Sequence, residues 1–222
     1  MKILSDQEKI GLFGGTFNPI HSGHIKAAGI VQRIFALDKV LFIPSFIPPH
    51  KESETIVSPG HRFKMVELAV ENIASFVASP IEIEEKGTSY SILTIQKISK
   101  IYPVGLFFFI LGIDAFLEID TWKNHERVLE QCKFVVISRK GYCLEDAKSV
   151  LDRKYASGMC DLSVSEKIRE NLDLSYRIFL LPFDALDVAS TEIRGRLRKK
   201  LSITHMVPES VADYIIRNNL YQ

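Results

Sequence analysis

Residues 9–25 read Lys-Ile-Gly-Leu-Phe-Gly-Gly-Thr-Phe-Asn-Pro-Ile-His-Ser-Gly-His-Ile. The apolar run at the start predicts a short buried strand, and the apolar residues after the histidines recur at helical spacing. Between strand and helix lie Gly14 and Gly15, which let a ligand approach the backbone because they carry no Cβ. Free N–H groups and the positive dipole end at a helix start attract anions. This stretch therefore predicts a strand–loop–helix unit with an anion site at the turn.

Two histidines, His21 and His24, stand three residues apart at the expected helix start. Imidazole nitrogens can hydrogen-bond the same anion, so the pair favours a phosphate site. The spacing matches neither the dinucleotide fingerprint nor a Walker loop. A metal site would need further ligands, and the cysteines at 132, 143 and 160 have no C-x-x-C spacing. A purely structural role for the two rings stays open at this point, and no metal ligand is predicted.

The bulk composition is that of an ordinary globular protein, with 222 residues, 46% hydrophobic residues and a net charge of +1. The low net charge argues against a nucleic-acid surface. Three cysteines without metal spacing fit a reducing cytoplasm. The longest apolar run, Gly105 to Ile113, is too short to cross a membrane. We therefore expect a single-domain cytoplasmic enzyme that binds neither nucleic acid nor membrane.

Strand and helix patterns alternate along the chain. Strands are expected at 9–14, 39–44, 76–83, 105–111, 133–138 and 176–182, and helices at 24–36, 60–72, 90–101, 123–131, 191–200 and 209–218, with a weaker pair at 145–154 and 163–171. This alternation predicts an α/β fold, a Rossmann-like doubly wound parallel sheet with helices on both faces and a small C-terminal helical portion at 190–222. Residues 139–175 are the least patterned and form a candidate insertion in the single domain 1–222. Ligands should bind beyond the carboxyl ends of the strands.

The segment Gly14–His24 resembles the T/H-x-G-H signature of the nucleotidyltransferase superfamily. Ser190-Thr191-Glu192-Ile193-Arg194 matches the second signature of that superfamily, I/S-S-T-x-x-R. Further segments are similar to the bacterial nicotinate-nucleotide adenylyltransferase branch: 48–51, 87–91, 111–114 followed by Trp122, and 207–221. These matches occur in order and span residues 10–222.

The resemblance implies transfer of the adenylyl group of ATP to nicotinate mononucleotide, with release of pyrophosphate. It implies Mg²⁺ bound through the ATP phosphates, and it allows a homo-oligomer. Two alternatives within the superfamily are nicotinamide mononucleotide and phosphopantetheine as acceptors. A different class of function is a nucleotide-binding regulator that has lost catalysis.

The resemblance also assigns residues to the reaction. His21, His24 and Arg194 are implied as catalytic, with ATP bound by Gly14, Gly15, Thr16, Phe17, His21, His24, Ser190, Thr191 and Arg194. The mononucleotide is implied to contact Thr16, Lys51, Thr88, Ser89, Tyr90, Asp114 and Trp122. For Trp122 the alternative is core packing, and for Asp114 it is a helix N-cap.

Two positions depart from the family pattern. Asn18 stands where the family often has aspartate, and Glu84-Glu85-Lys86 stand where an arginine usually precedes the glycine at 87. Arg62, in the helix expected at 60–72, is predicted to have a structural or supporting role.

Overall fold

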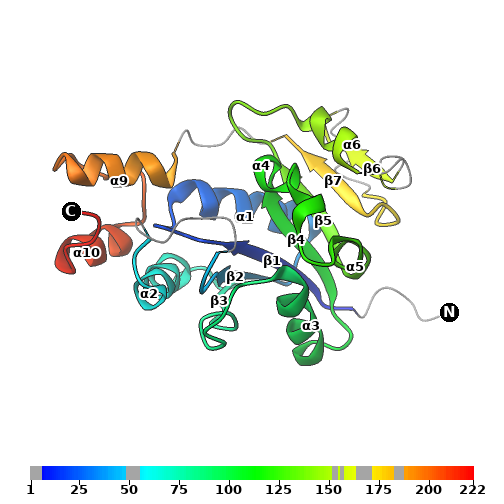
Figure 1. Ribbon diagram of the computed structural model, residues 1–222, viewed down its shortest axis with the longest axis horizontal. Helices are drawn as coiled ribbons and strands as arrows, with labels where there is room; N and C mark the ends of the chain where they lie inside the picture. Colours follow the sequence, from blue (N-terminus) through cyan, green and yellow to red (C-terminus); the bar gives the residue numbers. More distant parts are fainter. Residues whose placement is uncertain (1–6, 49–55, 152–154, 156–157, 164–171, 183–187) are drawn as a thin grey trace.

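The computed structural model describes residues 7–48, 56–151, 155, 158–163, 172–182 and 188–222. Seven strands in this part of the chain form one sheet in the order β3-β2-β1-β4-β5-β7-β6, and each neighbouring pair is parallel (Figure 1). The strands are β1 (Lys9–Gly15), β2 (Lys39–Pro44), β3 (Phe76–Ala78), β4 (Leu106–Gly112), β5 (Lys133–Ile137), β6 (Met159–Asp161) and β7 (Ile178–Leu181). The strand order reverses between β1 and β4, which confirms the predicted doubly wound sheet and places its topological switch point there.

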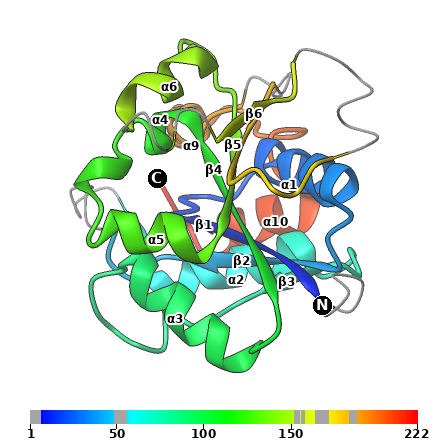
Figure 2. The same cartoon turned by 90° about the vertical axis from the view of Figure 1, so that its right-hand side faces the viewer.

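Helices cover both faces of the sheet. One face packs against α1 (Ser22–Phe35), α2 (Pro59–Val70), α9 (Ser190–Arg198) and α10 (Glu209–Arg217). The other packs against α3 (Ser91–Ile101), α4 (Ile113–Phe116), α5 (His125–Gln131) and α6 (Ala147–Val150). Figure 2 shows α1 and α5 on opposite sides of the strands. No helix in the described segments is long and apolar enough to span a membrane.

The core is divided in two by the sheet, and β4 shows how the sequence achieves this. Phe108 and Ile110 join the cluster under α1, whereas Phe107, Phe109 and Leu111 join the cluster under α3 and α5. Side chains of a strand alternate between faces, so a strand covered on both sides must be apolar at consecutive positions. The five consecutive apolar residues are therefore the direct signature of a central parallel strand.

The structure differs from the sequence-based expectation at the edges of the sheet. The strand expected over 76–83 ends at Ala78, because Pro80 has no N–H to donate to a neighbouring strand. The edge strand β6 was not predicted; it has three residues and no apolar alternation of useful length. Of the helix expected at 145–154, the described residues form a 3₁₀ turn at Leu144–Asp146 followed by the single turn α6, and residues 152–154 lie outside the described part. Most of the helix expected at 163–171 also lies outside it. The C-terminal helices are confirmed as α9 and α10.

Candidate active site

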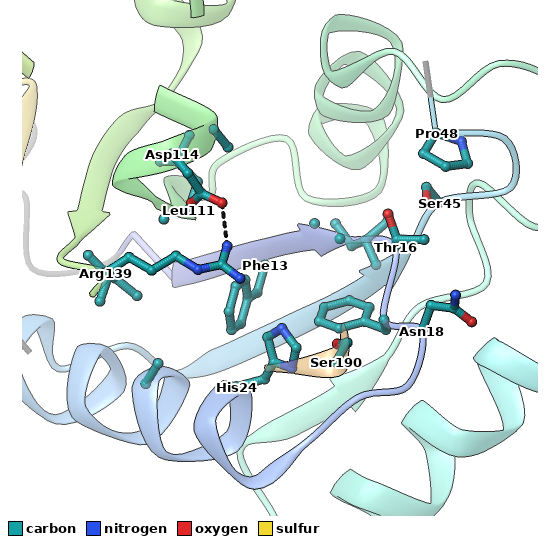
Figure 3. Close-up of a pocket in the computed structure, with 18 of the residues that line it drawn as sticks. Phe13, Thr16, Asn18, His24, Ser45, Pro48, Leu111, Asp114, Arg139 and Ser190 are labelled. Carbon is teal, nitrogen blue, oxygen red and sulfur yellow. Dashed lines mark hydrogen bonds and ion pairs between the residues drawn. The ribbon is translucent and has the colours of Figure 1, made fainter. Parts of the chain in front are cut away.

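An open cleft of about 1760 Å³ lies at the carboxyl ends of the strands (Figure 3). Its walls come from segments that follow β1, β2, β4 and β5 and from the start of α9. Most of the residues predicted from the sequence line it, namely Gly14, Gly15, Thr16, Phe17, His21, His24, Ser89, Tyr90, Asp114, Trp122, Ser190, Thr191 and Arg194. Thr88 is not among the lining residues; it bridges to Ile47 beside the cleft. Lys51 lies outside the described part of the chain.

His24 is held by the start of α1 and by two aromatic rings. The backbone N–H of His21 donates to Nδ1 of His24 at 3.2 Å. In a neutral ring, an accepting Nδ1 leaves the proton on Nε2, which makes Nε2 the donor. The edges of Phe13 and Phe17 pack against the His24 ring, with centroids 5.9 and 5.1 Å away. These contacts fix the direction of the ring, which lines the cleft (Figure 3).

His21 is the N-cap of α1 and is only 6% exposed. Its ring stacks on that of His24, with centroids 3.7 Å apart. Burial, and to a smaller extent the positive charge of Arg139, lower the pKa of His21 to about 4. At neutral pH the ring is therefore uncharged and acts as a hydrogen-bonding group. The pair does not place two like charges in contact.

Two buried side-chain atoms lack a hydrogen-bond partner within the described residues, and both belong to the cleft. They are Nδ1 of His21 and Oγ of Ser45. Buried polar atoms are nearly always paired, so an unpaired one in a cleft indicates a place for a polar ligand. Ser45 follows β2 directly, and its position at the carboxyl end of a strand was the sequence signal that could have identified it.

The start of α9 is tied to the loop between β1 and α1. Ser190 Oγ donates to the carbonyl of Pro19 at 2.9 Å, and Arg194 Nη1 donates to the carbonyl of Asn18 at 2.8 Å. The Ser190 hydroxyl is thus used within the protein. A guanidinium has five N–H donors, so Arg194 can hold this carbonyl and still bind an anion in the cleft that it lines.

Asn18 connects the loop to the end of the chain. It is buried, and its Oδ1 accepts from Tyr221 Oη at 2.8 Å and from the N–H of Val57 at 3.3 Å. In Figure 3 the Asn18 side chain points away from His24. The departure from aspartate at this position is therefore a change in a loop-supporting contact. Sequence reasoning could not identify Tyr221 as its partner, because 203 residues separate the two.

Asp114, at the start of α4, forms an ion pair with Arg139 (Figure 3). A Cβ at Gly112 would lie 2.4 Å from Asp114 Oδ1, so a larger residue there would require the Asp114 carboxylate to move. Arg139 also lines the cleft, although it falls at the start of the candidate insertion, residues 139–175. It follows β5 by two residues, and that position at the carboxyl end of a strand was the available signal.

The cleft also has an aromatic wall. Trp122 is half-buried, lines the cleft and meets Phe109 edge-on with ring centroids 5.7 Å apart, so it both packs on the core and faces the ligand space. The ammonium of Lys123 lies 4.4 Å from the centroid of the Tyr90 ring. Trp122 therefore offers an aromatic face for stacking, whereas the Tyr90 ring already contacts the Lys123 ammonium.

Ser89 is engaged by the protein itself. Its Oγ accepts from the N–H of Phe46 at 2.9 Å, and its hydroxyl bonds to the carboxyl group of Glu82. Thr94 Oγ1 donates to the same carboxyl group. Burial raises the pKa of Glu82, although the bonds from Ser89 and Thr94 act in the opposite direction. The predicted contact of the Ser89 hydroxyl with substrate would have to compete with this network.

The described residues contain no group of three or more His, Cys, Asp or Glu side chains that could hold a metal ion. The cleft instead presents two imidazole rings, the guanidinium groups of Arg139 and Arg194, and backbone N–H groups. This set of donors suits the oxygens of phosphate groups.

The family model described as cytidylyltransferase-like matches residues 12–196, which include both histidines and Arg194. The full chain is 37% identical over 222 residues to a probable nicotinate-nucleotide adenylyltransferase of Desulfitobacterium hafniense (strain Y51), and the match covers 100% of both chains. This chain belongs to the nicotinate-nucleotide adenylyltransferase family. The membership confirms the resemblance found in the motif segments.

Another member of the nicotinate-nucleotide adenylyltransferase family, from Desulfatibacillum aliphaticivorans, is 39% identical over 216 residues, which cover 96% of this chain and 99% of the relative. Among solved structures, the nicotinic acid mononucleotide adenylyltransferase of Plasmodium falciparum complexed with NaAD superimposes with a TM-score of 0.70 at 18% identity. That match covers 97% of this chain and 98% of the other. It shows that the two proteins share the fold.

Proposed function

We propose that this protein transfers the adenylyl group of ATP to nicotinate mononucleotide, giving nicotinate adenine dinucleotide and pyrophosphate. The observation that supports this most strongly is the pair of stacked histidines at the start of α1, with both rings lining the cleft. A helix N-terminus with a directed imidazole donor fits a phosphate better than any neutral ligand.

The reaction needs electrostatic help more than acid–base help. An oxygen of the mononucleotide 5′-phosphate attacks the α-phosphorus of ATP, and the bond from that phosphorus to the bridging oxygen of the β-phosphate breaks. The attacking oxygen is already anionic, so no proton has to be removed. The protein must bring two polyanions together and stabilise charge on the α-phosphate and on the departing pyrophosphate.

The described residues can be assigned to these tasks. His24 donates from Nε2 to the α-phosphate, and Arg194 binds the β- or γ-phosphate from α9. His21 and the backbone N–H groups of Gly15 to Phe17 complete the phosphate site. All of these residues line the same cleft.

The opposite wall would bind the mononucleotide. Trp122 offers a flat face for the pyridine ring. Asp114 would accept a ribose hydroxyl, and Arg139, its present partner, would stay nearby to balance the charge. The Ser89 hydroxyl is engaged, and the Ser89 N–H donates to the carbonyl of Ile47 at 3.0 Å. The nicotinate carboxylate is therefore expected to use other donors near Tyr90.

The divalent cation proposed for the reaction is Mg²⁺. The ATP phosphate oxygens would hold it, since hard cations prefer oxygen ligands and Mg²⁺ is usually bound through substrate phosphates. When bound, it neutralises part of the triphosphate charge.

The test is pyrophosphate release from ATP with three acceptors measured in parallel. These are nicotinate mononucleotide, nicotinamide mononucleotide and phosphopantetheine. We expect kcat/KM for nicotinate mononucleotide to be at least about a hundredfold higher than for nicotinamide mononucleotide. The amide has no carboxylate, so binding it would leave buried hydrogen-bond donors of the site unpaired. Comparable use of acid and amide would contradict the assignment of the pyridine pocket. Preference for phosphopantetheine would contradict the proposed acceptor altogether.

A further inference from the structure

Arg62 is a fully buried cation beside the cleft. It lies on α2, and its exposed fraction is 0%. Burying a guanidinium is costly unless its donors are paired. Here Nε donates to the carbonyl of Val57 at 3.1 Å, Nη1 to that of Thr16 at 2.8 Å and Nη2 to that of Phe46 at 3.0 Å. The three nitrogens therefore each hold a different backbone carbonyl.

The three carbonyls belong to segments far apart in the sequence. Thr16 follows β1 and lines the cleft. Phe46 follows β2 and lies next to Ser45, which also lines the cleft. Val57 precedes α2. Arg62 thus joins the ends of two neighbouring strands to the helix that supports them, at the edge of the sheet where the substrates are proposed to bind.

The bond to Thr16 determines the direction of the next peptide N–H. The peptide bond between Thr16 and Phe17 is trans, since the only cis bond among the described residues is at Asn18-Pro19. In a trans unit the C=O and N–H groups point in opposite directions. The carbonyl of Thr16 points to Arg62, so the N–H of Phe17 points away from the buried guanidinium.

Phe17 also has a strained backbone. Its φ is 47°, in the left-handed region that a bulky residue rarely adopts. Such conformations persist where surrounding contacts impose them, and they concentrate at functional sites. The bond from Arg62 to the preceding carbonyl is one such contact, and the packing of the Phe17 ring on Phe13 and His24 is another.

We propose that Arg62 is a positioning residue that holds the Thr16 carbonyl and thereby directs the N–H of Phe17 toward the phosphates of the bound nucleotide. The inference rests on the proposed adenylyl transfer. Arg62 does not line the cleft, but it would fix the orientation of the Phe17 N–H, which belongs to a residue that does. Lysine cannot reproduce this arrangement, because its three N–H donors share one nitrogen, whereas the three carbonyls are bonded by three separate nitrogens of the planar guanidinium.

The kinetic test compares Arg62→Lys with Met65→Ala. Met65 is equally buried on α2, so Met65→Ala should lower the melting temperature without changing the loops. We expect Arg62→Lys to lower kcat at saturating substrates by about 10- to 100-fold. Losses of rate on this scale are typical when a substitution slightly displaces the reacting groups. We expect Met65→Ala to keep the wild-type kcat. A folded Arg62→Lys variant with wild-type kcat would overturn the proposal, as would equal losses of kcat in both variants.

A second measurement follows the Phe17 amide directly by NMR during titration with ATP and Mg²⁺. In the wild-type protein its proton resonance should shift on binding. In Arg62→Lys that shift should be lost while the shift of Thr191 on α9 remains. A wild-type Phe17 amide that does not respond to ATP would overturn the proposal even if Arg62→Lys failed to fold. Wild-type turnover with nicotinate mononucleotide is measured separately, so a failure of the proposed function is distinguished from a failure of the role of Arg62.

Discussion

At the scale of single residues, His24 is where local structure and proposed chemistry meet most closely. Its Nδ1 is occupied by the N–H of His21, which assigns the proton of a neutral ring to Nε2. We expect His24→Ala to lower kcat by roughly two to three orders of magnitude, because one preorganised donor to transition-state charge is worth that much. Steady-state kinetics with a circular dichroism spectrum as the control for folding would measure it. A folded variant with unchanged kcat would remove His24 from the mechanism.

His21 gives a prediction about stability and pH. Its pKa is lowered from 6.5 to about 4 by burial, so between these values the unfolded chain binds a proton that the folded chain does not. Stability therefore rises with pH across this window, and acidification from pH 6.5 to 4 should remove on the order of 3 kcal/mol through this group. Urea unfolding at several pH values should show a shallower dependence for His21→Gln than for wild type. His205→Gln, which alters an exposed histidine, is the control. Parallel curves for wild type and His21→Gln would contradict the assignment.

At the scale of elements, the C-terminal segment after α10 supports the loop between β1 and α1. Tyr221 donates to Asn18, whose own carbonyl accepts from Arg194. We expect Tyr221→Phe to lower the free energy of unfolding by about 1 kcal/mol, the usual net value of one hydrogen bond. It should also raise KM for ATP, because the loop between β1 and α1, which is proposed to bind the phosphates, loses its hydrogen bond to Tyr221.

The matched control is Tyr214→Phe on α10. Tyr214 Oη forms a 2.9 Å hydrogen bond with Nδ1 of His61, and neither residue lines the cleft. Loss of this hydrogen bond should lower the free energy of unfolding by a similar amount, and it should leave KM for ATP unchanged. If the two variants change KM equally, the contact of Tyr221 with Asn18 has no specific role in ATP binding.

The elements also show what the sequence could and could not predict. Gly14 to His24 form a contiguous motif, so their strand–loop–helix unit and their place in the cleft could be predicted from local pattern alone. The contacts of Arg62, Tyr221 and Arg139 join segments that are distant in sequence, and no local periodicity encodes them. Edge strand β6 has only three residues, too few to give an alternation that a pattern could detect.

At the scale of the whole molecule, the sheet order places the binding site. The consecutive apolar residues of β4 and β5 predicted central parallel strands, and parallel strands bring their following loops to one edge. That is why motifs at residues 14–24, 111–114 and 190–194 meet in one cleft. The side-chain pairings within the cleft, such as Asp114 with Arg139, depend on rotamers and could not be predicted in this way.

In the proposed reaction the adenylyl group, and no other part of ATP, moves to nicotinate mononucleotide. The most direct measurement incubates the wild-type protein with that acceptor and Mg²⁺, using ATP labelled with ³²P in the α-position in one sample and in the γ-position in another. We expect the α-label to appear in nicotinate adenine dinucleotide and the γ-label to appear in pyrophosphate. Transfer of the γ-label to the mononucleotide, or no α-label in any dinucleotide, would contradict it.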